Sequence, residues 1–93
     1  MRINEWCTYI AEWREKRGFI TNKDNMLGKL MLVVTECAEA AEDVRGCNWE
    51  HFPEEIADTC IRLFDIAGSL GFDLEAAIAV KMGKNELCPL PRR

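Results

Sequence analysis

The chain has 93 residues, of which 48% are hydrophobic and 30% are charged, and its formal net charge is −4. The length fits one domain over residues 1–93, and the composition is typical of a globular rather than a disordered chain. The negative charge argues against a protein that grips the backbone of a nucleic acid, because such binding requires a basic face.

The first two predicted helices cover residues 4–17 and 26–45. In the first, apolar residues recur at helical spacing, and Gly18 follows a basic end. The second would be about 30 Å long, with Gly46 as its cap. One broad side of this helix is apolar. The opposite side contains Leu32 among polar residues, which are Lys29, Thr35, Glu36, Glu39, Glu42 and Asp43.

Two more helices are predicted over residues 53–70 and 74–87. Pro53 suits a first helical turn, Gly71 ends the third helix, and Asp73 is the expected N-cap of the fourth, which Pro89 and Pro91 follow. Six polar residues of the third helix fall within an arc of about 100°. They are Glu54, Glu55, Asp58, Arg62, Asp65 and Ser69.

The rest of the third helix surface is apolar, which is more than three other short helices can cover. We therefore predict an all-α fold, in which a four-helix chain forms an oligomeric helical bundle and another subunit covers part of this surface.

The five cysteines form no CxxC pair, and His51 is the only histidine, so a structural zinc site is not expected. Apolar neighbours of Cys7, Cys37 and Cys60 predict buried free thiols in a reducing compartment. The N-terminus lacks the apolar run of a signal peptide, and no stretch approaches the roughly 20 apolar residues of a membrane span. The sequence therefore predicts a cytoplasmic protein without membrane contact.

Two pairs of acids are the strongest chemical signal. Glu36 and Glu39 are three residues apart on the second helix, as are Glu55 and Asp58 on the third, so each pair shares one helix face. The short connection predicts antiparallel neighbours, which would bring four repelling carboxylates together around a cation. Oxygen ligands without histidine or thiolate favour Mg²⁺, Mn²⁺ or Ca²⁺. The alternative is that these acids are simply solvated, as most acids at this spacing are.

The segments LMLVVTECAEAAEDVR, FPEEIADTCIRLFDIAGSLGFDL and KMGKNELCP carry a resemblance. From about Lys29 to Pro89 the chain resembles the MazG-like all-α nucleoside triphosphate pyrophosphohydrolases, which carry EExxE followed by ExxD on the next helix. Here TECAE and EIAD occupy those places.

The resemblance implies a homodimer or homotetramer that hydrolyses a nucleoside triphosphate between its α- and β-phosphates, for housecleaning of the nucleotide pool, with Mg²⁺ or in its place Mn²⁺. By the match, Glu36, Glu39, Glu55 and Asp58 would be the catalytic metal ligands. Lys81 and Asn85 match late-helix positions near the substrate. Two positions depart from the family pattern: Thr35 replaces the first glutamate, and Cys88 stands where an arginine is frequent, a role that Arg92 or Arg93 would have to fill.

A base-binding pocket needs apolar walls. Trp6, Trp13, Phe19 and Trp49 are candidates to stack on a base, and Trp49 is the least expected in the core because it lies in a polar connection. His51 is expected at the surface or at a helix start rather than in catalysis. Two other functions stay open: a non-catalytic helical oligomerisation or regulatory module, and a nucleotide sensor that binds without turnover.

Overall fold

Four α-helices make up the part of the chain that the structure, a computed structural model, describes, residues 1–88. The helices are α1 (Ile3–Glu15), α2 (Met26–Arg45), α3 (Phe52–Leu70) and α4 (Leu74–Glu86), with a short 3-10 helix, η1 (Lys23–Asn25), before α2. The described residues form no strand, so the all-α prediction is confirmed. The predictions made for Pro89, Pro91, Arg92 and Arg93 lie outside the described residues.

Most helix ends fall where the sequence predicts them. The Asp73 side chain accepts a hydrogen bond from the backbone N–H of Ala76 at 2.9 Å and so caps α4. Gly71 ends α3 in the left-handed conformation with φ +75°, which favours glycine. The first helix is shorter than predicted, because α1 ends at Glu15 rather than Arg17.

The end of α2 differs in detail from the prediction. Gly46 follows the helix as expected, but the left-handed residue is Cys47, with φ +54°. The N–H of Cys47 donates to the carbonyl of Val44 at 3.1 Å, and the N–H of Asn48 donates to the carbonyl of Asp43 at 2.8 Å. This pair of bonds requires the left-handed conformation one residue after Gly46.

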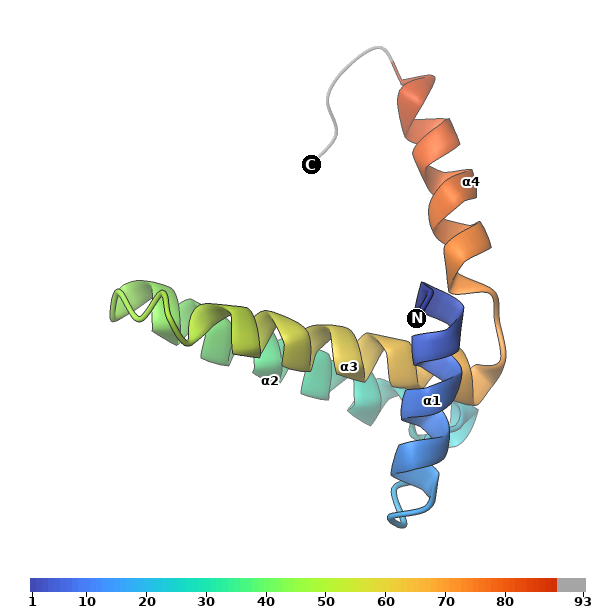
Figure 1. Cartoon of the computed structure of the whole chain (residues 1–93), viewed down its shortest axis with the longest axis horizontal. Helices are drawn as coiled ribbons and strands as arrows, with labels where there is room; N and C mark the ends of the chain where they lie inside the picture. Colours follow the sequence, from blue (N-terminus) through green and yellow to red (C-terminus); the bar gives the residue numbers. More distant parts are fainter. Residues whose placement is uncertain (89–93) are drawn as a thin grey trace.

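Figure 1 shows α2 and α3 side by side and antiparallel, with α1 crossing α3 near the C-terminal end of α3. The crossing is close: a Cβ atom on Gly68 would lie 2.1 Å from the carbonyl oxygen of Cys7. Glycine therefore lets the two backbones meet here. Cys7 and Ile10 of α1 and Ile66 and Ala67 of α3 form the small buried core at this crossing.

Helix α4 extends away from the α2–α3 pair and packs on α1 (Figure 1). Its first turn is tied to the N-terminus by polar contacts. Arg2 forms an ion pair with Glu75 at 3.0 Å, the backbone N–H of Asn4 donates to Glu75 at 3.0 Å, and the Asn4 side-chain amide donates to Asp73 at 2.7 Å. These contacts fix the start of α4, whereas the rest of the helix has no buried residue.

The acidic side of α2, not its apolar side, faces α3. The buried residues of α2 are Glu36 and Ala40. Large apolar residues are exposed on α2 and on α4 instead: Leu27, Leu30, Met31, Val34, Val44, Ile78, Val80 and Met82. This orientation is the reverse of an ordinary amphipathic helix and leaves an extensive apolar surface on a single chain.

The cysteine prediction is partly wrong. Cys7 is buried at the α1–α3 crossing, but Cys60 is half-buried and Cys37 is exposed, because the apolar side of α2 does not contact α3. Among the helices of residues 1–88, none has both the length and the apolar character needed to cross a membrane.

Candidate metal centre

Three of the four predicted carboxylates meet between α2 and α3. One carboxylate oxygen from each of Glu36, Glu39 and Glu55 lies within 4.8 Å of the other two. Asp58 is half-buried on the next turn of α3 and lies outside this close group, although its charge contributes to raising the pKa of Glu55. The antiparallel pairing therefore brings Glu36, Glu39 and Glu55 together, with Asp58 at the edge of the cluster.

Glu55 is the most confined member of the cluster. It is 8% exposed, and its Oε2 atom is buried without a hydrogen-bond partner. Burial raises its pKa above the ordinary glutamate value, the negative charge of Glu39 raises it further, and the nearby His51 opposes the shift. A buried oxygen without a donor is costly, so this site favours a group that supplies positive charge.

A basic side chain lies at each end of the cluster. Nε of Arg62 is 3.3 Å from Oε1 of Glu36 at the end nearer α1. At the other end, Nδ1 of His51 is 2.8 Å from Oδ2 of Asp43 and 3.7 Å from Oε1 of Glu55. Together they carry less positive charge than the carboxylates carry negative charge.

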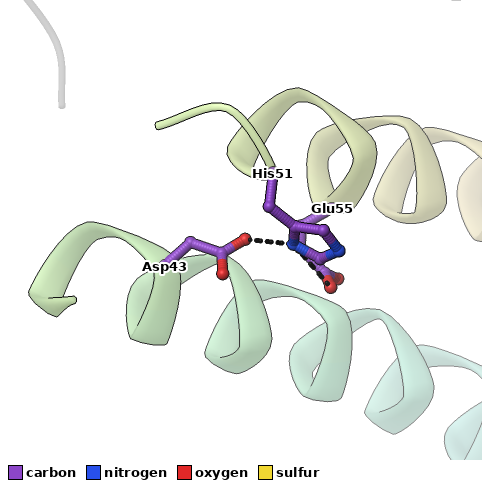
Figure 2. Close-up of side chains that lie close together, drawn as sticks. All are labelled: Asp43, His51 and Glu55. Carbon is purple, nitrogen blue, oxygen red and sulfur yellow. Dashed lines mark hydrogen bonds and ion pairs between the residues drawn. The ribbon is translucent and has the colours of Figure 1, made fainter. Parts of the chain in front are cut away.

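His51 lies at the start of α3, as predicted, but its side chain turns toward α2 (Figure 2). The hydrogen bond with Asp43 raises the pKa of the imidazole, and the charges of Asp43, Glu54 and Glu55 act in the same direction. Sequence reasoning overlooked this arrangement. The spacing of four residues between His51 and Glu55 was the available signal, because it places both on one helix face.

Thr35 stands where the MazG-like pattern has its first glutamate. Thr35 is exposed, and its hydroxyl donates to the backbone carbonyl of Met31 at 3.1 Å rather than facing the acids. Thr35 is therefore not a member of the cluster.

The predicted substrate-binding residues lie in the α2–α3 connection and on α4. Trp49 is 58% exposed in the α2–α3 connection, and its ring contacts Phe52 edge-on at 5.5 Å between centroids. Lys81 and Asn85 lie on α4, and within residues 1–88 neither forms a hydrogen bond or ion pair with the acidic cluster. A single chain thus brings the metal-ligand candidates together but not the candidates for phosphate contacts.

The other aromatic candidates lie away from the acids. Trp6 and Trp13 line an open apolar groove of about 400 Å³ between α1 and α3. Phe19 lies beside a second hollow and contacts the guanidinium of Arg14 at 4.7 Å. These three residues therefore belong to the α1 side of the molecule.

Comparison of the chain with models of known protein families, with curated proteins and with solved structures found no match. Three close carboxylates offer only hard oxygen donors, the ligands that Mg²⁺ and Mn²⁺ prefer. The residues present fit such an ion.

Proposed function

We propose that the protein is a magnesium-dependent pyrophosphohydrolase that converts a nucleoside triphosphate to its monophosphate and pyrophosphate. One observation carries the proposal: three carboxylate oxygens lie within 4.8 Å of one another around Glu55, whose second oxygen is buried without a partner. The order of these acids along two consecutive helices agrees with the resemblance to MazG-like enzymes.

Glu36, Glu39 and Glu55 would hold the ion, and Asp58 would complete the ligand set from the next turn of α3. Bound Mg²⁺ would offset phosphate charge and stabilise the charge that develops on departing pyrophosphate. Arg62 holds the carboxylate of Glu36 in place by its contact at 3.3 Å. The chain's own contribution is to hold mutually repelling acids in a fixed geometry, ready for a cation.

We further propose that the active form is a homodimer or homotetramer. The exposed apolar side of α2 and the uncovered surface of α4 support this, because a stable monomer rarely exposes so much apolar surface. Lys81 and Asn85 would then contact the triphosphate bound to a second subunit, since α4 extends away from its own α2–α3 pair (Figure 1). Met31→Lys on the exposed α2 side should reduce the mass measured by light scattering.

The test is a panel of canonical and modified nucleoside triphosphates, assayed for pyrophosphate with and without Mg²⁺. We expect release that depends on Mg²⁺ and that is lost in Glu39→Gln and Asp58→Asn. Glu42→Gln is the matched control, because its side chain on the same helix is 72% exposed. Full turnover by Glu39→Gln, or no pyrophosphate from any member of the panel, would refute the proposal.

The exposed apolar surface favours a second candidate, a non-catalytic oligomerisation or regulatory module. Such a module would form a stable oligomer that ignores Mg²⁺ and releases no pyrophosphate. A nucleotide sensor would instead bind a triphosphate in calorimetry without forming product. Pyrophosphate release therefore identifies the enzyme, and calorimetry with the same triphosphates separates the sensor from the module.

A further inference from the structure

A nitrogen donor lies beside the acidic cluster. One donor atom from each of Asp43, His51 and Glu55 lies within 4.8 Å of the other two. Figure 2 shows these side chains converging from the end of α2 and the start of α3, with the imidazole between the two carboxylates. This group differs from Glu36, Glu39 and Glu55 in containing an imidazole, and it shares Glu55 with that group.

We propose that Asp43, His51 and Glu55 form a second metal position, which takes a divalent first-row transition-metal ion such as Zn²⁺ or Co²⁺. Imidazole nitrogen favours such ions over Mg²⁺, whereas a purely carboxylate site favours Mg²⁺. Glu55 has two oxygens and can donate one to each ion, so the two positions adjoin through a single carboxylate.

The burial of Glu55 is the independent observation that points to a bound ion. Glu55 is 8% exposed, its Oε2 atom has no hydrogen-bond partner, and its Oε1 atom lies 3.7 Å from Nδ1 of His51, beyond hydrogen-bond distance. The imidazole directs Nδ1 to Asp43 at 2.8 Å instead. The fold thus leaves a buried carboxylate oxygen available next to a nitrogen ligand, which a metal ion would satisfy at once.

The competing explanation is purely structural: the Asp43–His51 contact would only hold the end of α2 against the start of α3. In that case a transition metal would leave the imidazole unchanged. Binding of a transition-metal ion at this position does not depend on the proposed hydrolysis.

The experiment uses the full chain with ¹³C,¹⁵N-labelled histidine. Because His51 is the only histidine, every imidazole signal belongs to it. Zn²⁺ is titrated while the imidazole signals are recorded, with Mg²⁺ in a parallel titration. Because the imidazole itself is observed, binding of Zn²⁺ to cysteine thiols elsewhere does not contribute. We expect Zn²⁺ to shift the ring signals far more than Mg²⁺, because only Zn²⁺ would bind the ring nitrogen directly.

Two variants test the ligand set. Asp43→Asn should weaken the response of the ring to Zn²⁺ by about tenfold or more, the scale of changes in and around metal ligands. Glu42→Gln removes one charge from the same turn of α2 without removing a proposed ligand, so it should leave the response unchanged. Ring signals that stay constant as Zn²⁺ is added, or an equal response in Asp43→Asn, would overturn the proposal.

If Asp43→Asn does not fold by circular dichroism, Glu55→Gln replaces it with the same ring readout, and an unchanged response there overturns the proposal equally. The outcome is distinct from that of the hydrolysis assay. A shift of the His51 ring signals without pyrophosphate release refutes the proposed enzyme but supports the metal position. Pyrophosphate release with ring signals that Zn²⁺ leaves unchanged supports the enzyme and refutes the metal position.

Discussion

Two buried carboxylates on α3 have opposite surroundings. Asp65 is 3% exposed, and both its oxygens have partners: Oδ2 lies 2.6 Å from the hydroxyl of Thr21 and 3.2 Å from Nε of Arg14, and Oδ1 accepts from Ser69 at 3.0 Å. Glu55 is 8% exposed, and its Oε2 has no hydrogen-bond partner. The same helix therefore carries one carboxylate that the fold satisfies and one that it does not.

The difference distinguishes a structural carboxylate from a candidate ligand. Asp65 joins the α1–α2 connection to α3, so its charge is used to hold the chain together. Glu55 lies among other acids, and burial with the charge of Glu39 raises its pKa. A buried group that destabilises the fold of the isolated chain is a candidate for function, because a ligand can relieve the cost.

The largest expected effect is at Asp65. Asp65→Ala should lower the free energy of unfolding by about 3–5 kcal/mol, because it leaves the poorly exposed Arg14 without its counter-charge. Urea denaturation followed by circular dichroism at constant protein concentration measures this. Asp65→Asn, which can still accept from Thr21 and Ser69, should lose less. A loss below about 1 kcal/mol in the alanine variant would contradict the structural role.

A second prediction concerns the α1–α3 crossing. Gly68→Ala should cost about 1–3 kcal/mol, because the new Cβ would lie 2.1 Å from the backbone oxygen of Cys7 and the helices would have to separate. Gly28→Ala is the matched control, since nothing lies within 4 Å of its Cβ position. Equal thermal midpoints for the two variants would show that α1 does not cross α3 at Gly68.

Glu55→Gln should stabilise the fold at neutral pH, whereas the two substitutions above destabilise it. The pKa of Glu55 is higher in the folded state than in the unfolded state. Its stabilising contribution to the free energy of unfolding is therefore complete below the unfolded-state pKa, and it is lost as the pH rises through the folded-state pKa. At neutral pH without divalent ions, the glutamine variant should therefore melt at a higher temperature than the wild type, and the difference should shrink in acid.

The same variant should lose function. We expect Mg²⁺ to raise the melting temperature of the wild type but not of Glu55→Gln, and pyrophosphate release to fall about a hundredfold or more. Thermal melts from mildly acidic to neutral pH, with and without Mg²⁺, test both the higher melting temperature of the variant and its missing response to Mg²⁺. A variant that is less stable than the wild type at neutral pH would show that Glu55 is structural, like Asp65.

The smallest effect is expected on the solvent side of α2. Glu42 pairs with Arg45, but both side chains are at least 70% exposed. Glu42→Gln should change the free energy of unfolding by less than about 0.5 kcal/mol, since exposed ion pairs contribute little. A larger change in the same urea experiment would mean that a partner covers this side of α2.

Helix positions were predictable because they depend on local signals. Asp73, Gly71 and Pro53 act within one turn of their own position, and the structure has them at helix ends. The i, i+3 acid pairs likewise fixed which carboxylates share a helix face. The closeness of Glu36, Glu39 and Glu55 followed from one further step, the antiparallel pairing of α2 with α3.

The contact of His51 with Asp43 was not predictable, because it spans the turn between the helices, whereas the spacing of His51 and Glu55 was a usable signal. The left-handed residue after α2 was missed for a similar reason. The bonds that close the helix place that conformation on Cys47, although Gly46 is the residue that tolerates it best.

The sequence by itself determined an all-α chain, the ends of its helices and the faces on which its acids lie, because these depend on residues within a few positions of one another. Only the tertiary structure decided that the acidic side of α2 turns inward, that Asp65 is satisfied while Glu55 is not, and that α4, which carries Lys81, extends away from the α2–α3 pair. Those outcomes depend on which helix packs against which, and that choice balances the burial of the whole chain rather than the preference of any one segment.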